Sequence, residues 1–374
     1  MKHNWEYKKL GDICEILDSQ RKPVTKTERV SGPYPYYGAS GIQDYVHDYL
    51  FDGKYLLVGE DGAKWGSNEK SAFSVSGKIW VNNHAHVLDF ASSPVKQNLI
   101  EYFLCFKDLN LYVKGAIIPK LNQQLLKAIN VPIPPREEQE RIVAELDKIN
   151  EVIEECRELL RTLDSLAQSI FYDTFGDPIS NPKGWPIRQI SEIGEIERGT
   201  GISKKDFVAN GSPCIHYGQL HTAFGPTAHK HLTCIPKNLL SKPKIAHPRD
   251  VIMAITSEDV EGSCKSTAWL GDYDIIVGSD AAILHHNQNG VYISYYTLTS
   301  AFSHEKAKYA KGFKVTHISS KEIGSIPIMV PPLSLQQQFA AQIEAIEAQK
   351  NAVEATISEM KTLLDSRMDY WFND

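Results

Sequence analysis

The sequence lacks the features that would place it in a membrane or in an oxidising compartment. No run of about 18 apolar residues occurs among its 374 residues, so we expect no membrane-spanning helix. Met1–Glu6 does not resemble a signal peptide, and the six cysteines are scattered without a Cys-x-x-Cys pair. Both observations predict a cytoplasmic protein without a disulfide framework.

Motifs of nucleotide and cofactor chemistry are also missing. No Gly-x-x-x-x-Gly-Lys-Ser/Thr loop occurs, so no phosphate-binding loop is predicted. Adenine methyltransferases use a Phe-x-Gly-x-Gly loop and an Asn/Asp-Pro-Pro-Tyr/Phe tetrad for their cofactor and flipped base, and neither is present. The pairs Pro134-Pro135 and Pro331-Pro332 lack the amide or carboxylate in front of them. We therefore expect a non-catalytic chain that binds no cofactor itself.

The net charge is weakly negative but unevenly distributed. The chain carries a formal charge of −6. Residues 136–173 hold 11 acidic and 5 basic side chains and residues 333–374 hold 7 and 3, which leaves 28 acidic and 32 basic side chains elsewhere. The rest of the chain is thus mildly basic, a balance that permits nucleic-acid binding without demonstrating it.

The sequence does contain an internal repeat. Residues 114–149 align with residues 311–346 at a constant offset of 197 and without a gap, so that Gln139 meets Gln336. A second similarity opens each half, where Trp5 and Trp185 precede the same apolar spacing at an offset of 180. Two copies of one module predict a pseudo-twofold molecule, which suits a target that is itself twofold.

A long helix is expected at the end of each half. Apolar residues in 142–170 step alternately by four and three, and the same register recurs in 339–371, where only Lys350 and Arg367 interrupt it. This 3.5-residue period predicts a coiled-coil seam roughly 42 Å long or more at about 1.5 Å per residue. The alternative is two amphipathic helices, each buried on a globular core. Paired prolines upstream prevent an earlier helix start.

We divide the chain into a first module, a first spacer helix, a connector, a second module and a second spacer helix. Their bounds are 1–135, 136–173, 174–186, 187–332 and 333–374. The modules read as α+β with a mixed sheet. Expected strands are 54–58, 79–81, 85–88, 131–134, 251–255, 275–277 and 281–284, and expected helices are 99–109 and 291–302. Asn122 and Ser319-x-x-Glu322 are expected to cap helices. The second module has net insertions relative to the first, and we expect them within residues 206–248.

Contacts to a nucleic acid would come from basic, amide, hydroxyl and aromatic side chains of the modules. In the first module the candidates are Tyr36, Tyr37, Ser40, Lys64, Trp65, Lys78, Asn82, Asn83, Lys114 and Lys120. In the second they are Arg198, Thr200, Lys204, Lys205, Tyr217, Gln219, Thr256, Ser257, Lys265, Lys311 and Lys314. For each of them a merely solvated side chain is the alternative. Lys114 and Lys311 share a repeat position, which points to a common phosphate contact; packing against the helix base is the alternative.

Other repeated or clustered residues favour structural roles. Gln139 and Gln336 lie at helix starts, where we expect a structural or partner-docking role rather than base reading. His84 and His86 alternate along a strand and face one side, either as plain sheet surface or toward DNA. Cys214-x-His216 and His229-x-His231-x-x-Cys234 offer zinc-ligand types, but their spacing matches no common finger, so we expect polar loops and no metal.

Two divergent modules, each followed by a helix introduced by Pro-Pro-x-x-x-Gln, resemble the specificity subunit of type I restriction-modification enzymes. Three stretches carry the resemblance, which spans essentially the whole chain: Gly115 with Ile133–Ile142, their copies Gly312 with Val330–Phe339, and the connector Phe171–Trp185. The second copy has Leu335-Gln336 in place of the family's usual Glu-Gln pair, but its heptad pattern continues.

The resemblance implies a division of labour. Each module would be a target-recognition domain that reads one half of a split, asymmetric site in double-stranded DNA, and the helices would form an antiparallel spacer. Two modification subunits would carry S-adenosylmethionine-dependent adenine methylation. Restriction subunits would bring ATP- and Mg-dependent translocation and cleavage. Other readings are a coiled-coil protein scaffold, the specificity subunit of a fused methylase–nuclease system and, least favoured, a stand-alone enzyme.

Overall fold

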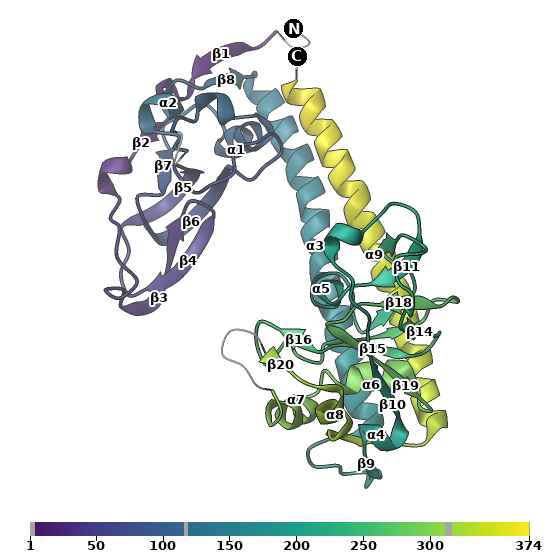
Figure 1. Cartoon of the computed structure of the whole chain (residues 1–374). Coiled ribbons are helices and arrows are strands. Elements are labelled where there is room, and N and C mark those ends of the chain that lie inside the picture. Colours follow the sequence, from purple (N-terminus) through teal and green to yellow (C-terminus); the bar gives the residue numbers. More distant parts are fainter. Residues whose placement is uncertain (1–3, 116–118, 311–315, 374) are drawn as a thin grey trace. The chain divides into compact units, whose positions relative to one another are not determined.

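The computed structural model describes residues 4–115, 119–310 and 316–373 (Figure 1). The chain divides into two compact units: residues 1–158 with 354–374, and residues 159–353. Two 40-residue helices, α3 (Arg136–Phe175) and α9 (Leu333–Phe372), run through both units. About half of each helix belongs to each unit. None of the helices in the described parts of the chain combines the length and apolarity needed to cross a membrane.

The first unit is built on one mixed sheet of six strands in the order β2-β7-β5-β6-β3-β4. Its strands are β2 (Glu15–Ile16), β3 (Ser31–Gly38), β4 (Gly41–Val46), β5 (Phe51–Gly59), β6 (Ala72–Val81) and β7 (Ala85–Asp89). The β3–β6 pair is parallel and the other pairs are antiparallel. Helix α1 (Gln97–Phe106) covers the sheet and contacts α3, as Figure 1 shows.

The smaller elements of the first unit close its core beside the spacer helices. Strand β1 (Glu6–Lys9) pairs with β8 (Asn130–Ile133), directly before α3. In the part of this unit that the structure describes, four short helical turns complete it: η1 (Leu10–Asp12), η2 (Asp18–Gln20), η3 (Asn110–Tyr112) and α2 (Gln123–Lys127). The side chain of Asn122 accepts a hydrogen bond from the Leu125 amide, so the predicted cap of α2 is confirmed.

The second unit holds two larger sheets. One has the order β10-β19-β15-β17-β12 and the other β13-β11-β18-β14. Their strands are β10 (Gly194–Arg198), β11 (Ser212–Ile215), β12 (Thr227–Ala228), β13 (Thr233–Ile235), β14 (Ile245–Ala246), β15 (Val251–Ala254), β17 (Ser266–Trp269), β18 (Ile275–Val277) and β19 (Ala281–His286). Residues 206–248, where the insertions were expected, supply β11 to β14 and thus most of the second sheet.

Among its described residues, two strand pairs and six short helical segments complete the second unit. Strand β9 (Ile187–Gln189) pairs with β21 (Pro327–Met329), and β16 (Thr256–Ser257) pairs with β20 (Thr316–His317). The helical segments are α4 (Ile190–Ile193), η4 (Lys204–Asp206), α5 (Tyr217–Thr222), α6 (Gly290–Tyr296), α7 (Ser300–Ala307) and α8 (Ser320–Gly324). Ser319 and Glu322 form the predicted capping box of α8.

The helix expected at 291–302 is two helices, which corrects that prediction. Helix α6 ends at Tyr296, and Thr299 caps the next helix by accepting a hydrogen bond from the Phe302 amide. A threonine hydroxyl that accepts a hydrogen bond from a backbone amide favours the start of a new helix over continuation of the preceding one. The chain therefore turns at this point. The apolar pattern runs through the break because both helices face the same core.

The predicted coiled-coil seam is confirmed in both units, where α3 and α9 run antiparallel. In the first unit Ile142 and Leu146 are buried beside Trp371, and in the second Leu163 and Ala167 are buried with Ile343. The two polar interruptions of the second stripe are both ion-paired with α3. Lys350 Nζ lies 2.9 Å from Asp164 Oδ1, and Arg367 pairs with Glu145. Acidic partners on the facing helix thus accommodate both polar positions.

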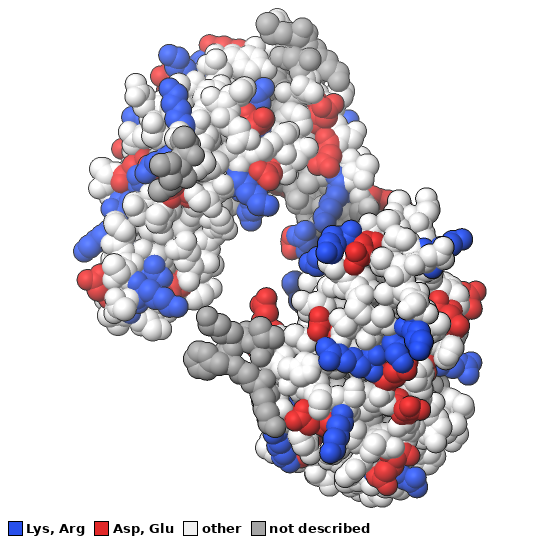
Figure 2. Space-filling view, viewed as in Figure 1, with Lys and Arg blue, Asp and Glu red and all other residues white. Residues whose placement is uncertain are grey.

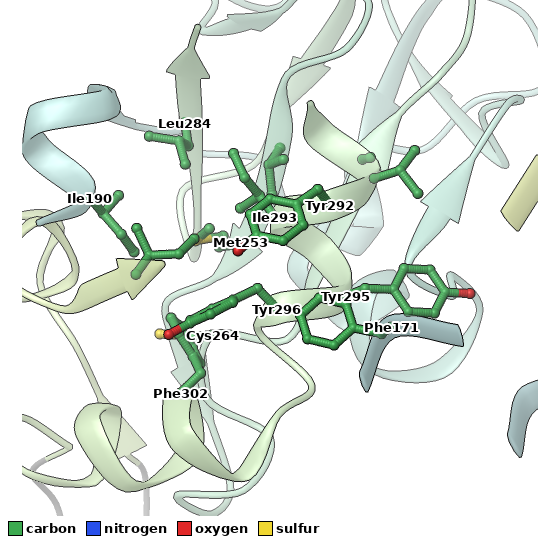
Figure 3. Close-up of a cluster of buried hydrophobic side chains, with 14 of the residues drawn as sticks. Phe171, Ile190, Met253, Cys264, Leu284, Tyr292, Ile293, Tyr295, Tyr296 and Phe302 are labelled. Atoms are coloured by element: carbon green, nitrogen blue, oxygen red, sulfur yellow. The ribbon is translucent and has the colours of Figure 1, made fainter. Parts of the chain in front are cut away.

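Aromatic side chains join the spacer to the second module. Phe171 of α3 stacks on Tyr292 of α6, with ring centroids 5.8 Å apart and 12° between the planes. Phe339 of α9 packs edge-on against Phe171 and Phe175. Figure 3 shows part of this cluster around α6. Because such aromatic pairs add stabilisation beyond their buried area, both helices are fixed to the module.

The repeated glutamines make the same contacts in both units. The amide nitrogen of Gln139 donates to the Pro134 carbonyl at 3.0 Å, and its oxygen accepts from the Lys96 amide, at the N-cap of α1, at 2.8 Å. Gln336 donates to the Pro331 carbonyl at 2.8 Å and accepts from the Asn289 amide, the N-cap of α6, at 2.9 Å. Each side chain is buried. The expected structural role of the two glutamines is confirmed.

We expect Gln336→Ala to lower the free energy of unfolding by about 1–3 kcal/mol, because it leaves a buried amide and a buried carbonyl unpaired. Gln336→Glu should destabilise as well, since a carboxylate cannot donate to Pro331. The matched control is Gln337→Ala, an exposed neighbour of the same residue type. Denaturant unfolding followed by circular dichroism measures all three. Equal stability of the Gln336 and Gln337 variants would contradict the bridging role.

Candidate nucleic-acid interface

A cavity of about 1000 Å³ lies in the second unit, at the mouth formed by α5, β16 and the loop after it. Six of the predicted contact residues line it: Lys204, Tyr217, Gln219, Thr256, Ser257 and Lys265. These residues come from three separate stretches of the sequence, which the fold brings to one place. The cavity is therefore the main concentration of predicted contact residues in the second unit.

The walls of this cavity combine cations, acids and aromatic rings. Lys265, the residue before β17, donates from Nζ to the His221 carbonyl of α5 at 3.0 Å, which ties the two segments together. Lys306 is buried, and its ammonium donates at 2.6 Å to the carbonyls of both Glu261 and Ser263. Burial lowers the pKa of Lys306 below its ordinary value. The lysine thus holds the loop of residues 258–263 against the module.

The remaining candidates of the second module lie outside the cavity. Arg198 donates to the Ser279 carbonyl at 2.9 Å and stays largely exposed, as does Lys205. Thr200 accepts a hydrogen bond from the Lys244 amide at 2.8 Å, which gives it a local structural role. Lys311 and Lys314 lie outside the described residues.

In the first unit, four candidates gather around the turn Asp61-Gly62. The hydroxyl of Ser40 donates to the Gly62 carbonyl, and Lys120 Nζ lies 3.5 Å from Asp61. Lys114 pairs with Lys120 through backbone hydrogen bonds, while Asn83 directly precedes His84, which contacts Asp61. The hydrogen bond that Lys120 donates to the Glu60 carboxylate, 3.0 Å away, raises the pKa of Lys120 more than any other contact does. The cluster is polar and mixed in sign.

Three first-module candidates are enclosed by the module, which corrects the expectation for them. The Tyr36 hydroxyl bonds to the Val24 backbone, and the Trp65 indole donates to the Gly59 carbonyl at 3.1 Å. Asn82 donates to Gln43 at 3.2 Å and accepts from the His84 amide at 2.8 Å. All three are buried and unavailable to a ligand in this structure. Their polar atoms serve the fold.

The other first-module candidates remain accessible. The Lys64 side chain is 81% exposed. Lys78 is exposed and lies over the Tyr49 ring, 4.7 Å from its centroid. Tyr37 lies on β3 of the β3–β4 hairpin, is half-buried and packs on Phe73 of β6. The hairpin places Tyr37 in the sheet.

His86 is neither sheet surface nor accessible to DNA, which corrects both alternatives for it. It is fully buried, with Nδ1 2.6 Å from Asp18 and Nε2 2.7 Å from the Leu121 carbonyl. Asp18, Glu60 and His86 form a group of potential metal ligands among the described residues. Arg21 already occupies this group, with its guanidinium 2.7 Å from Glu60 and 3.4 Å from Asp18. The geometry is that of a buried ion-pair network.

Three of the five side chains considered for zinc have other partners. The Cys214 thiol lies 3.4 Å from the Thr233 hydroxyl. His216 caps α5 by accepting from the Gly218 amide, and burial lowers the pKa of this histidine. His231 bonds to the Tyr273 hydroxyl at 2.6 Å. These contacts stabilise the second sheet and the start of α5.

Some residues of these polar clusters were not predicted from the sequence. Asp61, Asp280 and His317 contact predicted candidates in one module or the other. For His317 a signal existed, because it lies at offset 197 from Lys120 in the repeat. Figure 2 shows basic and acidic side chains interspersed on the face in view. Recognition by such a surface would depend on individual side chains rather than on a broad electrostatic field of one sign.

The two modules with their mixed sheets, each joined to antiparallel helices by a repeated bridge, define a protein of two tandem modules with an internal repeat. Residues 2–162 and 182–360 both match the type I restriction modification DNA specificity domain. The chain therefore belongs to the family of type I restriction-modification DNA specificity proteins.

Several known relatives match along nearly the whole chain, and others along about half of it. A protein of Haemophilus influenzae, named as a type I restriction enzyme specificity subunit, is 25% identical over 93% of this chain and 89% of its own. A type I specificity subunit of Methanocaldococcus jannaschii is 22% identical over 92% of this chain and 86% of its own. The crystal structure of the type I S subunit from M. genitalium has a TM-score of 0.59 at 12% identity, over 99% of this chain and 96% of its own. That likeness confirms the fold predicted from the sequence.

Lys64 and Trp65 are sequence neighbours with opposite environments, so their variants should differ sharply. We expect Trp65→Ala to lower the free energy of unfolding by about 3–5 kcal/mol, because it empties a buried site and removes a hydrogen bond. Lys64→Ala should change it by less than about 0.5 kcal/mol. Thermal unfolding of the two purified variants beside the parent protein measures both. Similar losses in both would contradict the burial described above.

Proposed function

We propose that this chain is the sequence-reading subunit of a type I restriction-modification complex. Each module reads one half of a split site in double-stranded DNA. The observation that carries the proposal is the duplicated family match, 2–162 and 182–360, on two modules whose polar clusters differ in side chains. Different clusters in equivalent modules predict two half-sites of different sequence.

The chain itself acts by binding and positioning. Sequence is read by hydrogen bonds to base edges, while lysine and arginine contacts to phosphates set orientation. Adenine methylation with S-adenosylmethionine would be carried out by two modification subunits, and ATP- and Mg-dependent translocation and cleavage by restriction subunits. The absence of nucleotide and methyltransferase motifs in the sequence supports a non-catalytic role. The complex would work in the cytoplasm.

The outer faces of the helices offer surface for these partners. Leu159 and Leu166 of α3 lie one heptad apart, and both are nearly half exposed. Leu363 of α9, the repeat equivalent of Leu166, is also exposed. Exposed leucines on a seam-forming helix favour contact with another protein. This observation also fits a protein scaffold, which differs from the proposal in having no salt-dependent DNA binding.

Methylome sequencing tests the proposal. A host expressing this chain with its modification subunits should carry methyladenine in both halves of one split motif. The motif should vanish when this chain is deleted, because the modification subunits would lose their sequence reader. A methylome that is unchanged by the deletion would contradict the proposal.

The helices should set the gap between the half-sites. Deleting residues 155–161 and 352–358, one heptad at equivalent positions of each helix, removes about 10 Å at about 1.5 Å per residue. We expect the motif to keep both half-sites and to lose about three base pairs of its gap, at about 3.4 Å per base pair. The same methylome assay reads the gap directly. A normal gap in the shortened protein would rule out the spacer role.

A further inference from the structure

The two modules share one pattern of backbone hydrogen bonds, here called the backbone frame. It lies at the residue that follows a central strand, β5 in the first module and β15 in the second. In the first, the Glu60 amide donates to the His84 carbonyl, and the Leu121 amide donates to the Glu60 carbonyl, both at 2.8 Å. In the second, Ile255 takes the place of Glu60. Its amide donates to the Asp280 carbonyl, and its carbonyl accepts from the Ile318 amide, both at 3.0 Å. The frame is the same although the sequences differ.

The residues that follow Glu60 and Ile255 form equivalent backbone pairings in the two modules. Asp61 pairs antiparallel with Lys120, and Thr256 pairs antiparallel with His317. Lys120 and His317 are separated by the repeat offset of 197, so the internal repeat itself relates the two pairings. The three equivalent positions are therefore 61, 84 and 120 in the first module and 256, 280 and 317 in the second.

The three side chains of the first module meet at one point. Asp61 contacts the imidazole of His84, and its other oxygen lies 3.5 Å from Lys120 Nζ. The side chain of Asp61 is 17% exposed, whereas those of His84 and Lys120 are 47% and 42% exposed. The least exposed member thus contacts both of the exposed ones, and Lys120 Nζ is held as well by Glu60 Oε1 at 3.0 Å.

The second module repeats this arrangement with other chemistry. The Thr256 hydroxyl lies 3.4 Å from Asp280 Oδ1 and 3.3 Å from His317 Nδ1. Asp280 is 41% exposed, His317 is exposed, and Thr256 lines the cavity that holds Lys204 and Lys265. The second cluster therefore adjoins the main concentration of predicted contact residues in its unit.

We propose that these two clusters, Asp61–His84–Lys120 and Thr256–Asp280–His317, are the equivalent base-reading positions of the two modules. The inference rests on the proposed DNA-reading function. A phosphate clamp would consist of cations alone, but each cluster includes a carboxylate that repels phosphate. A carboxylate instead accepts from the exocyclic amine of cytosine, and lysine donates to guanine O6 and N7. Lys120 thus favours guanine in one half-site, and Asp280 favours cytosine in the other.

A structural role alone does not explain the clusters. Their outer members are solvent-exposed, and exposed ion pairs contribute about 0–1 kcal/mol to stability. The shared frame is made by backbone groups, so side chains at these positions are free to vary without loss of the fold. Positions that keep their geometry and change their chemistry are suited to distinguishing two half-sites.

Selection from a library of duplexes with randomised sequence tests the inference. The full chain is assembled with its modification subunits, and bound duplexes are sequenced. Lys120→Ala should reduce the preference for guanine by about 10-fold at one position of one half-site, and Asp280→Asn should do the same for cytosine in the other. Lys9→Ala and Arg188→Ala, exposed residues on β1 and β9, are the controls and should leave both half-sites unchanged.

The outcomes separate this inference from the proposed function. If the unaltered complex enriches no split motif, the proposed function and the inference both fail. If it does, but Lys120→Ala weakens binding equally for all sequences and lowers the salt dependence, Lys120 contacts phosphate and the inference is wrong for it. Unchanged half-sites in both variants would overturn the inference as a whole. Thermal unfolding of each variant confirms that a changed preference does not reflect loss of fold.

Discussion

Each module is attached to its spacer helix through one buried side-chain amide, and the rest of the architecture depends on this attachment. Gln139 and Gln336 each join the carbonyl of the first proline of the upstream pair, Pro134 or Pro331, to the N-cap amide of the module's own helix. An amide offers both a donor and an acceptor, which neither a carboxylate nor an ammonium can do. Since a buried unpaired polar group is costly, the bridge fixes the module helix at the start of the spacer helix.

The polar positions of the helix seam complement this attachment. An apolar stripe alone would tolerate slippage of the antiparallel pair by a heptad, whereas Lys350 and Arg367 each require an acidic partner at one position of α3. Burial acts to raise the pKa of Glu145, but hydrogen bonds from Arg367 and Trp371 outweigh it and hold that pKa below its usual value. The polar residues thus specify register while the apolar ones supply affinity, a use of seam polarity known in coiled coils.

Local sequence signals predicted the parts of the fold that local physics determines. The helices after each proline pair, the Asn122 cap and the Ser319–Glu322 capping box all follow from hydrogen bonding within a few residues. Burial, in contrast, is decided by distant segments. Tyr36 and Trp65 carry the same chemistry as a base-stacking residue, and only the folded sheet shows that their polar atoms bond inside the module. His86 was misread for the same reason, because its partner Asp18 is remote in sequence.

The contrast between constant and variable parts explains how a weakly charged chain can recognise DNA. The repeated bridges and backbone frames hold each module in a fixed geometry, which limits the conformational entropy lost on binding. With the geometry fixed, a few side chains at the end of a central strand suffice for discrimination. Affinity from phosphate contacts would then be shared with partner subunits, so the modules need no broad basic face. In a DNA-recognition module organised in this way, sequence specificity changes through exposed residues such as Lys120 and His317, while the buried glutamine bridges stay the same.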